Sequence, residues 1–396
     1  MKICYLCGDP GIPILGRKGC STHVRETARS LQAAGHETFI ITPNPGDDSD
    51  GNNDIEILKV PGFTTKKVGS DMRHYLYNHR LVHEATQLFV QRRPDVIYER
   101  YALYSTAGAT LARRFLLPRI LEVNSFLVHE QKSRLHFHKL AHWFEKKIIR
   151  GAPYNVVVSS PLRDAFIKMG VDPERIIIMP MAVDIKTFNP DCSGIDLRAK
   201  FDIPKDSLIV GYVGTLTGWH GINLLYEAGQ LLKKRGLPVV FLVIGGDPAK
   251  VKTHRVKVAE HNLQDGLRFA GSVSYQDVPH YISSLDVCLI PNSHHWASPT
   301  KMFEYQAMGK PVVAPRLIPI EDAMTHQQEG LLFEPESVKG MVELIEVLLK
   351  NPEMRKEMGQ RARSRVIKNH AWENNVNRII DVFELMLEEK KKKYAF

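Results

Sequence analysis

Short apolar runs alternate with amphipathic runs along almost the whole chain, and this alternation constrains the fold more than any other feature. The apolar runs have the length of buried strands and lie at residues 3–7, 38–42, 55–60, 96–99, 119–123, 208–213, 239–244, 267–270, 286–290, 312–314 and 330–333. Strands that alternate with helices form parallel sheets with helices on both faces. The pattern therefore predicts the α/β class.

The chain is long enough for two domains, because its 396 residues allow two cores of ordinary size. Residues 189–206 are rich in Pro, Asp and Gly and separate two sets of alternating runs. We therefore predict one domain at 1–190, a second at 207–371 and a terminal helix at 372–396.

The stretch WASPTKMFEYQAMGKPVVA, residues 296–314, carries the strongest local signal. Ser298 is a favoured N-cap and Pro299 a favoured first-turn residue, so a helix should begin here. The positive end of such a helix attracts phosphate. Glu304, one turn further on, can accept hydrogen bonds from the hydroxyls of a ribose. The stretch therefore indicates a nucleotide-sugar site, although a capped helix before a buried strand also occurs in every doubly wound protein.

Two glycine-containing loops follow predicted strands, at residues 8–19 and 214–221. Ligands of parallel sheets bind at the carboxyl ends of strands, and Gly19 would let backbone approach a substrate closely. The second loop is not a P-loop, because no Gly-Lys-Ser/Thr triplet closes it. A crossover loop without a ligand is the alternative for both.

The stretch 298–314 resembles the donor-binding signature of family-four retaining glycosyltransferases, in the form S-P-T/L-K-x-F-E-Y-x-A-x-G-K-P-V-V-A. The resemblance covers nearly the whole chain. It implies the GT-B fold, with two facing Rossmann-like domains, an interdomain cleft, acceptor binding in the first domain and donor binding in the second. It also implies that the C-terminal helix at 372–396 crosses back to the first domain. The implied reaction moves a hexose-type sugar from a UDP- or GDP-sugar to an acceptor hydroxyl with retention, in glycan, glycolipid or surface polysaccharide biosynthesis.

The same resemblance assigns roles to individual residues. The implied donor-binding residues are Gly19, Gly214, Thr215, His220, Gly271, Val273, Ser298, Pro299, Thr300, Lys301 and Glu304. For a contact with the donor sugar, where relatives often carry a His, the chain offers Asn124 or His129 as catalytic candidates.

The chain departs from the family pattern at several of these places. Trp296 stands where the commoner pattern has a second Glu, and Thr215 and His220 stand where an Arg and a Lys are usual. A neutral His supplies no full charge, so Lys301 is the nearest cation for the diphosphate. These departures leave open the sugar, the base and a second hypothesis, in which the chain is a non-catalytic homologue that serves as a partner or regulatory subunit.

No metal site is expected. The neighbouring His294 and His295 cannot readily aim at one ion, and Cys4 and Cys7 lie three apart on a strand and point to opposite faces. A helix terminus with cations can neutralise a diphosphate without metal. We therefore expect no metal and no cofactor besides the nucleotide-sugar co-substrate.

The chain carries a formal net charge of +9, which suits an anionic membrane surface or anionic substrates. Nucleic acid is the weakest partner, because no nucleic-acid-binding motif accompanies the charge. Lys146, Lys147 and Arg150 lie near Trp143 on a predicted helix, which could rest on anionic lipid or turn its apolar stripe to the core. Without a signal peptide or a 20-residue apolar run, we expect a cytoplasmic location, with peripheral contact to the inner membrane surface left open.

Overall fold

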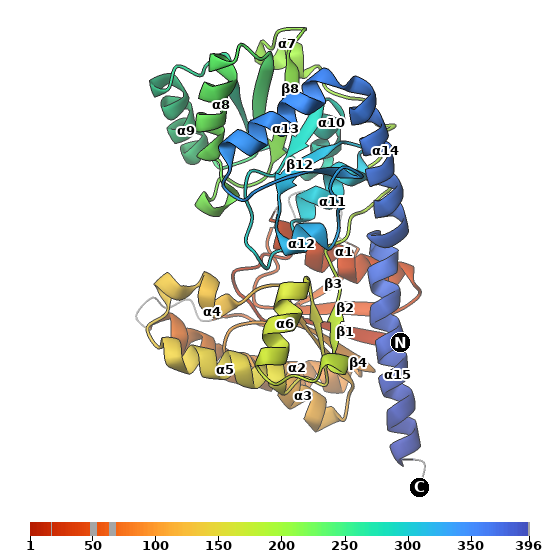
Figure 1. Cartoon of the computed structure of the whole chain (residues 1–396). Helices are drawn as coiled ribbons and strands as arrows, with labels where there is room; N and C mark the ends of the chain where they lie inside the picture. The colour runs from red at the N-terminus through yellow and green to blue at the C-terminus, as the bar shows by residue number, and fades with distance from the viewer. Residues whose placement is uncertain (17, 48–53, 63–68, 395–396) are drawn as a thin grey trace. The chain divides into compact units, whose positions relative to one another are not determined.

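The computed structural model describes residues 1–16, 18–47, 54–62 and 69–394. The chain divides into two compact units (Figure 1), one formed by Met1–Pro180 with Trp372–Phe396 and the other by Met181–Ala371. Each unit is built on a parallel sheet with helices on both faces, so the predicted α/β class with two Rossmann-like domains is confirmed.

The first unit contains a seven-stranded sheet of order β3-β2-β1-β4-β5-β6-β7. Its strands are β1 (Lys2–Cys7), β2 (Glu37–Thr42), β3 (Glu56–Lys59), β4 (Val96–Arg100), β5 (Arg119–Val123), β6 (Tyr154–Val157) and β7 (Ile176–Ile178). Its helices are α1 (Gly19–Ala33), α2 (Ser70–Arg92), α3 (Ala107–Phe115), α4 (Leu127–Glu130), η1 (Lys132–Arg134), α5 (His138–Arg150), α6 (Ser160–Lys168), η2 (Pro173–Arg175) and α15 (Trp372–Tyr394).

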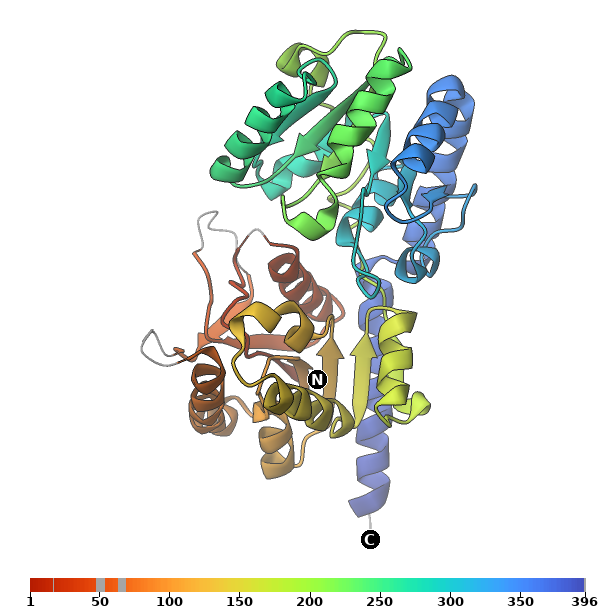
Figure 2. The same ribbon diagram turned by 60° about the vertical axis from the view of Figure 1, so that its left-hand side comes forward.

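The alternation of side chains along β1 explains the layers of this unit. Ile3 and Tyr5 pack on the face that α1 and α15 cover, whereas Cys4 and Leu6 pack on the face that α2 and α3 cover. Figure 2 shows α15 running alongside this unit. Phe383 of α15 is fully buried in the same cluster as α1, which ties the C-terminal helix to the first unit.

The second unit contains a six-stranded sheet of order β10-β9-β8-β11-β12-β13. Its strands are β8 (Leu208–Val213), β9 (Val239–Ile244), β10 (Leu267–Gly271), β11 (Val287–Leu289), β12 (Val312–Pro315) and β13 (Gly330–Phe333). Its helices are α7 (Leu197–Phe201), η3 (Gly218–His220), α8 (Leu224–Lys234), α9 (Pro248–Glu260), η4 (Tyr275–Asp277), α10 (Val278–Ser283), α11 (Thr300–Ala307), α12 (Ile318–Glu321), α13 (Val338–Lys350) and α14 (Pro352–Asn369).

Two apolar layers enclose this second sheet. Val210 and Phe241 lie in the layer with α8, α9 and α13, and Ile209 and Leu242 lie in the layer with α10, α11 and α14. Both faces are buried, which is why its strands read as nearly continuous apolar runs.

The structure divides the chain earlier than the predicted boundary at 189–206. Residues 181–206 belong to the second unit, because Phe188, Leu197 and Ile203 are buried in its core. Pro, Asp and Gly mark the loops of this segment, but its apolar side chains decide where it packs.

Candidate functional site

In the second unit, polar side chains gather around Lys301 at the carboxyl edge of the sheet, where the strand order changes direction. From β8, the sheet grows on one side through β9 and β10 and on the other through β11, β12 and β13. Because β8 and β11 pair in parallel, the loops that follow them leave the same edge as neighbours. Open parallel sheets bind ligands at such a switch point.

Glycine lets the loop after β8 pack directly against Lys301. Gly214 has a φ of 151°, and a Cβ there would lie 2.7 Å from Tyr212 Oη and 3.0 Å from Lys301 Nζ. Gly245, just after β9, has a φ of 116°, and a Cβ there would lie 2.3 Å from the carbonyl oxygen of Gly214. Both positions therefore need glycine for this close approach.

Lys301 lies in the first turn of α11, with polar groups and an aromatic ring around its ammonium group. Nζ lies 3.1 Å from Tyr212 Oη, 3.3 Å from His220 Nδ1 and 4.5 Å from the centre of the Tyr212 ring. Burial lowers the pKa of Lys301 to about 7, and the negative charge of Glu304 opposes this shift only in part.

Glu304 lies one turn after Lys301 on α11 and is 9% exposed. Burial raises the pKa of Glu304 to about 7, again opposed only in part by the charge of Lys301. The site therefore holds an acid and a base that both titrate near neutral pH. Such perturbed pairs are typical of functional sites.

His220 ends η3 and links Lys301 to the loop after β8. In its ammonium form Lys301 can only donate, so His220 Nδ1 accepts and Nε2 carries the hydrogen that is donated to Thr215 Oγ1 at 3.1 Å. Burial lowers the pKa of His220 to about 2, helped by the charges of Lys301 and His294. The ring is therefore neutral, and the hydroxyl of Thr215 keeps its own hydrogen to donate to another acceptor.

The start of α11 differs from the prediction in one detail. The expected N-cap at Ser298 is wrong: Pro299 is the N-cap residue, Thr300 is the first helical residue and no side chain caps the helix. The hydroxyl of Ser298 instead accepts a hydrogen bond from the backbone N–H of Met181 at 3.1 Å. The N–H groups of the first turn are thus left without a side-chain cap.

An aromatic stack borders the cluster, and it was not foreseen from the sequence. The rings of Trp219 and His294 are stacked with centres 4.7 Å apart, and those of His294 and Trp296 with centres 4.8 Å apart. Trp296 is buried and Trp219 is 42% exposed. The available signal was that the loops after β8 and β11 each contain Trp and His. Whether these rings stack, however, depends on where the two loops lie relative to each other.

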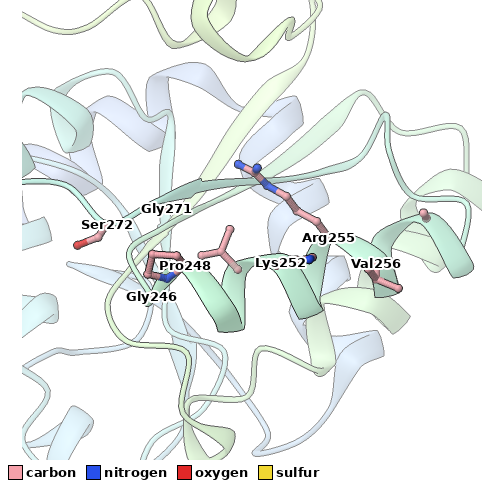
Figure 3. A pocket seen from close by; sticks show the side chains of 9 residues that line it. Gly246, Pro248, Lys252, Arg255, Val256, Gly271 and Ser272 are labelled. Atoms are coloured by element: carbon pink, nitrogen blue, oxygen red, sulfur yellow. The ribbon is translucent and has the colours of Figure 1, made fainter.

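Gly271 ends β10, and Val273 follows it at the edge of the core. The carbonyl oxygen of Gly271 accepts a hydrogen bond from Gly245 N–H at 2.7 Å. A hollow of about 520 Å³ beside Gly271 is drawn in Figure 3, with Pro248, Lys252, Arg255 and Val256 of α9 along it and Gly246, Gly271 and Ser272 at one end. Of the predicted donor residues only Gly271 lines it, so this hollow is separate from the cluster around Lys301.

The first unit has its own polar cluster, at the carboxyl ends of β4 and β5. Glu122 is fully buried, accepts a hydrogen bond from Tyr5 Oη at 2.9 Å, contacts His23 Nε2 and lies 3.6 Å from Arg100 Nη1. These neighbours, His23 first, hold the pKa of Glu122 at about 2 against the effect of burial.

Asn124, one of the two catalytic candidates, joins this cluster. With its amide oxygen turned toward Arg100, it accepts hydrogen bonds from both terminal nitrogens of that guanidinium, at 2.5 and 3.0 Å. His129 is exposed on α4. Gly19 is the first residue of α1, and a Cβ there would meet no neighbouring heavy atom within 4 Å among the described residues. Close packing therefore does not explain why residue 19 is a glycine.

The histidine pair after β11 has two different settings. His294 belongs to the aromatic stack, whereas the ring of His295 meets Trp296 edge-on at 4.4 Å. Among the residues that the structure describes, no group of three His, Cys, Asp or Glu side chains is arranged to hold a metal ion.

Two protein families match the chain in succession. Residues 17–187 match Glycosyltransferase Family 4, and residues 195–365 match Glycosyl transferases group 1. The D-inositol 3-phosphate glycosyltransferase of Pseudarthrobacter chlorophenolicus is 25% identical, over 89% of this chain and 87% of that protein.

Solved structures resemble the whole chain. Sucrose-phosphate synthase from Thermosynechococcus elongatus matches with a TM-score of 0.81 and 21% identity, covering 98% of this chain and 100% of that one. Anabaena Alr3699/HepE in complex with UDP matches with a TM-score of 0.76 and 17% identity, covering 97% and 100%. The same Anabaena protein has also been solved with UDP-glucose. At these identities the likeness shows the fold.

Proposed function

This chain belongs to the family-4, group 1 glycosyltransferases and has their GT-B fold, and we propose that it moves a hexose-type sugar from a UDP- or GDP-sugar to an acceptor hydroxyl with retention at the anomeric carbon. The product would enter a glycan, glycolipid or surface polysaccharide. The observation that carries the proposal is the presence of half-buried Lys301 and buried Glu304, one turn apart at the start of α11 and beside the loop after β8.

The donor diphosphate would bind at the N-terminus of α11. The positive end of α11, the ammonium of Lys301 and the hydroxyl of Thr215 are all placed to interact with an anion there. An anion next to Lys301 favours the charged amine, so binding raises its pKa above 7 and completes the neutralisation of the diphosphate.

Glu304 would hold the nucleoside. Its carboxylate can accept hydrogen bonds from the two hydroxyls of the ribose, which favour the ionised form. The backbone around Gly271 and Val273 would meet the base, as the resemblance to the family implies. Exposed Trp219 at the end of the aromatic stack offers a flat apolar surface beside these groups.

Transfer would rely on orientation and on stabilisation of the leaving group, without a protein nucleophile. The leaving diphosphate oxygen would accept the proton of the attacking hydroxyl on the same face of the sugar, which accounts for retention. Lys301 and the α11 N-terminus would stabilise the charge that develops on that oxygen. Asn124 or His129 would contact the donor sugar, and no metal or other cofactor would be needed.

Calorimetric titration tests the donor site directly. UDP, GDP and ADP and their hexose conjugates are titrated into the full chain, first with EDTA and then with magnesium. We expect selective binding of one base in EDTA. Glu304→Ala should weaken that binding about thirtyfold, because a lost hydrogen bond to a charged group is worth about 2 kcal/mol.

Glu343→Ala on α13 is the matched control, since this carboxylate is exposed and outside the cluster. It should leave binding unchanged. Equal affinity of Glu304→Ala and the unaltered chain would remove Glu304 from the donor site. Once an acceptor is found, NMR of the anomeric proton in the product tests retention.

A non-catalytic role as a partner or regulatory subunit is the second candidate, and one observation favours it. Trp296, in an aromatic stack, occupies the place where a carboxylate is usual in the family. In that case the chain would bind a nucleotide but would not cleave the donor. Slow hydrolysis of a nucleotide-sugar by the purified chain, lost in Lys301→Met, would reject this candidate.

A further inference from the structure

Exposed apolar side chains gather on one part of the first unit, over α2 and α5. Among the described residues, six of the fifteen large apolar side chains that are exposed lie here; we call Met72, Tyr75, Leu76, Phe137, Leu140 and Trp143 the α2–α5 patch. Their exposed fractions range from 40% for Leu76 to 60% for Phe137. Scattered exposed apolar residues are normal, but a gathered set marks an interaction surface.

The patch lies on helix faces that point away from the core. On α2, Met72, Tyr75 and Leu76 follow helical spacing, while the core face of that helix is formed by residues such as Leu81 and Phe89. The exposed apolar stripe of α2 is therefore separate from the stripe that buries the helix.

The same separation holds on α5. Ala141 and Ile148 are buried, whereas Leu140 and Trp143, three apart, are 48% and 54% exposed. One apolar stripe of α5 therefore faces the core, as one of the two options for this helix had it, and a second apolar stripe faces outward.

Contacts within the unit join the two helices into one surface. The ring of Tyr75 on α2 lies 6.3 Å from that of Phe144 on α5, and Phe144 in turn meets Trp143 edge-on at 5.0 Å. Asp71, at the start of α2, accepts a hydrogen bond from the backbone N–H of His136 at 2.9 Å. The apolar residues of α2 and α5 are therefore held in a fixed relation.

The charges along α5 and the segment before it are nearly all positive. Residues 132–150 contain six Lys or Arg and one acidic residue. That acid, Glu145, is buried and accepts hydrogen bonds from Tyr101 Oη and Val128 N–H, so it does not offset the exposed cations. Lys139, Lys146, Lys147 and Arg150 are all exposed.

The lysines lie on the same outward face as the apolar groups. Lys147 Nζ is 4.6 Å from the centre of the Trp143 ring, so an ammonium and an indole are presented together. Trp is favoured at the interface between lipid head groups and acyl chains, and Lys reaches outward from that depth to phosphate. A basic helix face with exposed Leu and Trp has the composition of a surface that rests on anionic lipid.

We propose that the α2–α5 patch binds the surface of a bilayer rich in anionic phospholipids, with Leu140 and Trp143 entering the interfacial layer and Lys146 and Lys147 pairing with lipid phosphates. None of the helices that the structure describes has the length and hydropathy that a bilayer crossing requires. The contact would therefore be peripheral. It goes beyond the proposed transfer reaction and does not depend on it.

Vesicle co-sedimentation of the full chain tests the proposal. Vesicles of equal parts phosphatidylcholine and phosphatidylglycerol are compared with vesicles of phosphatidylcholine alone. We expect the chain to sediment with the mixed vesicles, to bind phosphatidylcholine at least tenfold more weakly, and to be released by salt near 1 M, where charges are screened beyond about 3 Å.

Two double variants separate the apolar from the charged contribution. Leu140→Ser with Trp143→Ser should weaken binding at least about tenfold through lost apolar burial, and Lys146→Glu with Lys147→Glu should do so through lost attraction. All four side chains are exposed, so folding is retained and is checked by an unchanged thermal midpoint. Val256→Ser and the pair Lys252→Glu with Lys257→Glu, all exposed on α9, are the matched controls and should bind as the unaltered chain does.

Several results would overturn the proposal. One is absence of binding to the mixed vesicles, and another is equal binding by the patch variants and the unaltered chain. A third is loss of vesicle binding in the charge variant but not in the apolar variant, which would mean that the chain adsorbs to the surface without insertion. A dimer in analytical ultracentrifugation that dissociates in the Leu140 and Trp143 variant, without vesicle binding, would assign the patch to a second copy of the chain. Quenching of tryptophan fluorescence by brominated lipid should fall clearly in Trp143→Phe, and unchanged quenching would contradict insertion.

Discussion

The two sheets carry polar clusters at the same place, the edge where the strand order changes direction, but the clusters differ in charge. In the first unit Arg100 faces Glu122, and the pKa of Glu122 is held at about 2. In the second unit Lys301 lies beside neutral Tyr212 and neutral His220, and burial brings its pKa to about 7.

In the first cluster the buried charges are satisfied by neighbouring residues, whereas in the second the charge of Lys301 is not fully satisfied. His23, Tyr5 and Arg100 together surround the carboxylate of Glu122, so its charge is satisfied within the cluster. Lys301 has neutral Tyr212 and His220 beside its ammonium, and the charge of Glu304 offsets the effect of burial only in part, so a further anion would stabilise the charged amine. The structure of the second cluster is therefore the one that a ligand would complete, while the first cluster mainly holds Asn124 in place.

The largest expected effect on stability should appear in only one cluster. Arg100→Met removes one charged partner of buried Glu122, which keeps His23 and Tyr5, and should lower the free energy of unfolding by about 2 kcal/mol, or the thermal midpoint by about 6 °C. Lys301→Met removes a cation that burial disfavours and should leave the midpoint unchanged or raise it. Differential scanning calorimetry of both variants without ligand checks this. Equal destabilisation would mean that both clusters are structural.

The next effect concerns donor binding, and here the second cluster should be the sensitive one. Lys301→Met should weaken nucleotide affinity about a hundredfold, as expected for loss of about 3 kcal/mol from a charge-assisted contact to diphosphate. Lys310→Met is the control: burial also lowers the pKa of Lys310, but its Nζ donates to the Ser283 carbonyl at 2.7 Å. Similar losses of affinity in both variants would show that Lys301 has no special part.

The pH dependence should sharpen the comparison further. Below pH 7 Glu304 becomes protonated and above pH 7 Lys301 loses its proton, so kcat/KM should be bell-shaped around neutral pH and fall about tenfold per pH unit on each side. Glu304→Gln should remove the acidic limb and keep the alkaline one. His220, with a pKa of about 2, should add nothing between pH 5 and 9. A profile that is flat from pH 5 to 9 would exclude the pair from transfer.

The smallest effect should come from Thr215. Its hydroxyl accepts from His220 and can donate onward, so Thr215→Val should weaken donor binding about fivefold, in the range of one neutral hydrogen bond. Thr215→Ser keeps the hydroxyl and should bind normally. If Ser and Val variants bind alike, the hydroxyl makes no contact with the donor.

Much of the fold could be predicted from the chain alone. Runs such as 208–213 and 239–244 became β8 and β9 at the predicted bounds, because strands buried on both faces read as continuous apolar sequence. A helix beginning near residue 300 was also anticipated, and α11 is followed by Gly309, which has a φ of 64°. The domain boundary was harder, because polar loops and buried Phe188 occur in one segment.

Local sequence thus determined the elements, their order, and the presence of Lys301 and Glu304 one turn apart on a helix. Only the tertiary structure decided their chemistry. Tyr212 lies 89 residues from Lys301 in the chain, and the burial that brings the pKa of that lysine to about 7 arises only when β8 and α11 pack together. Helix and strand patterns depend on neighbours in sequence, whereas the charge state of a buried group depends on neighbours in space.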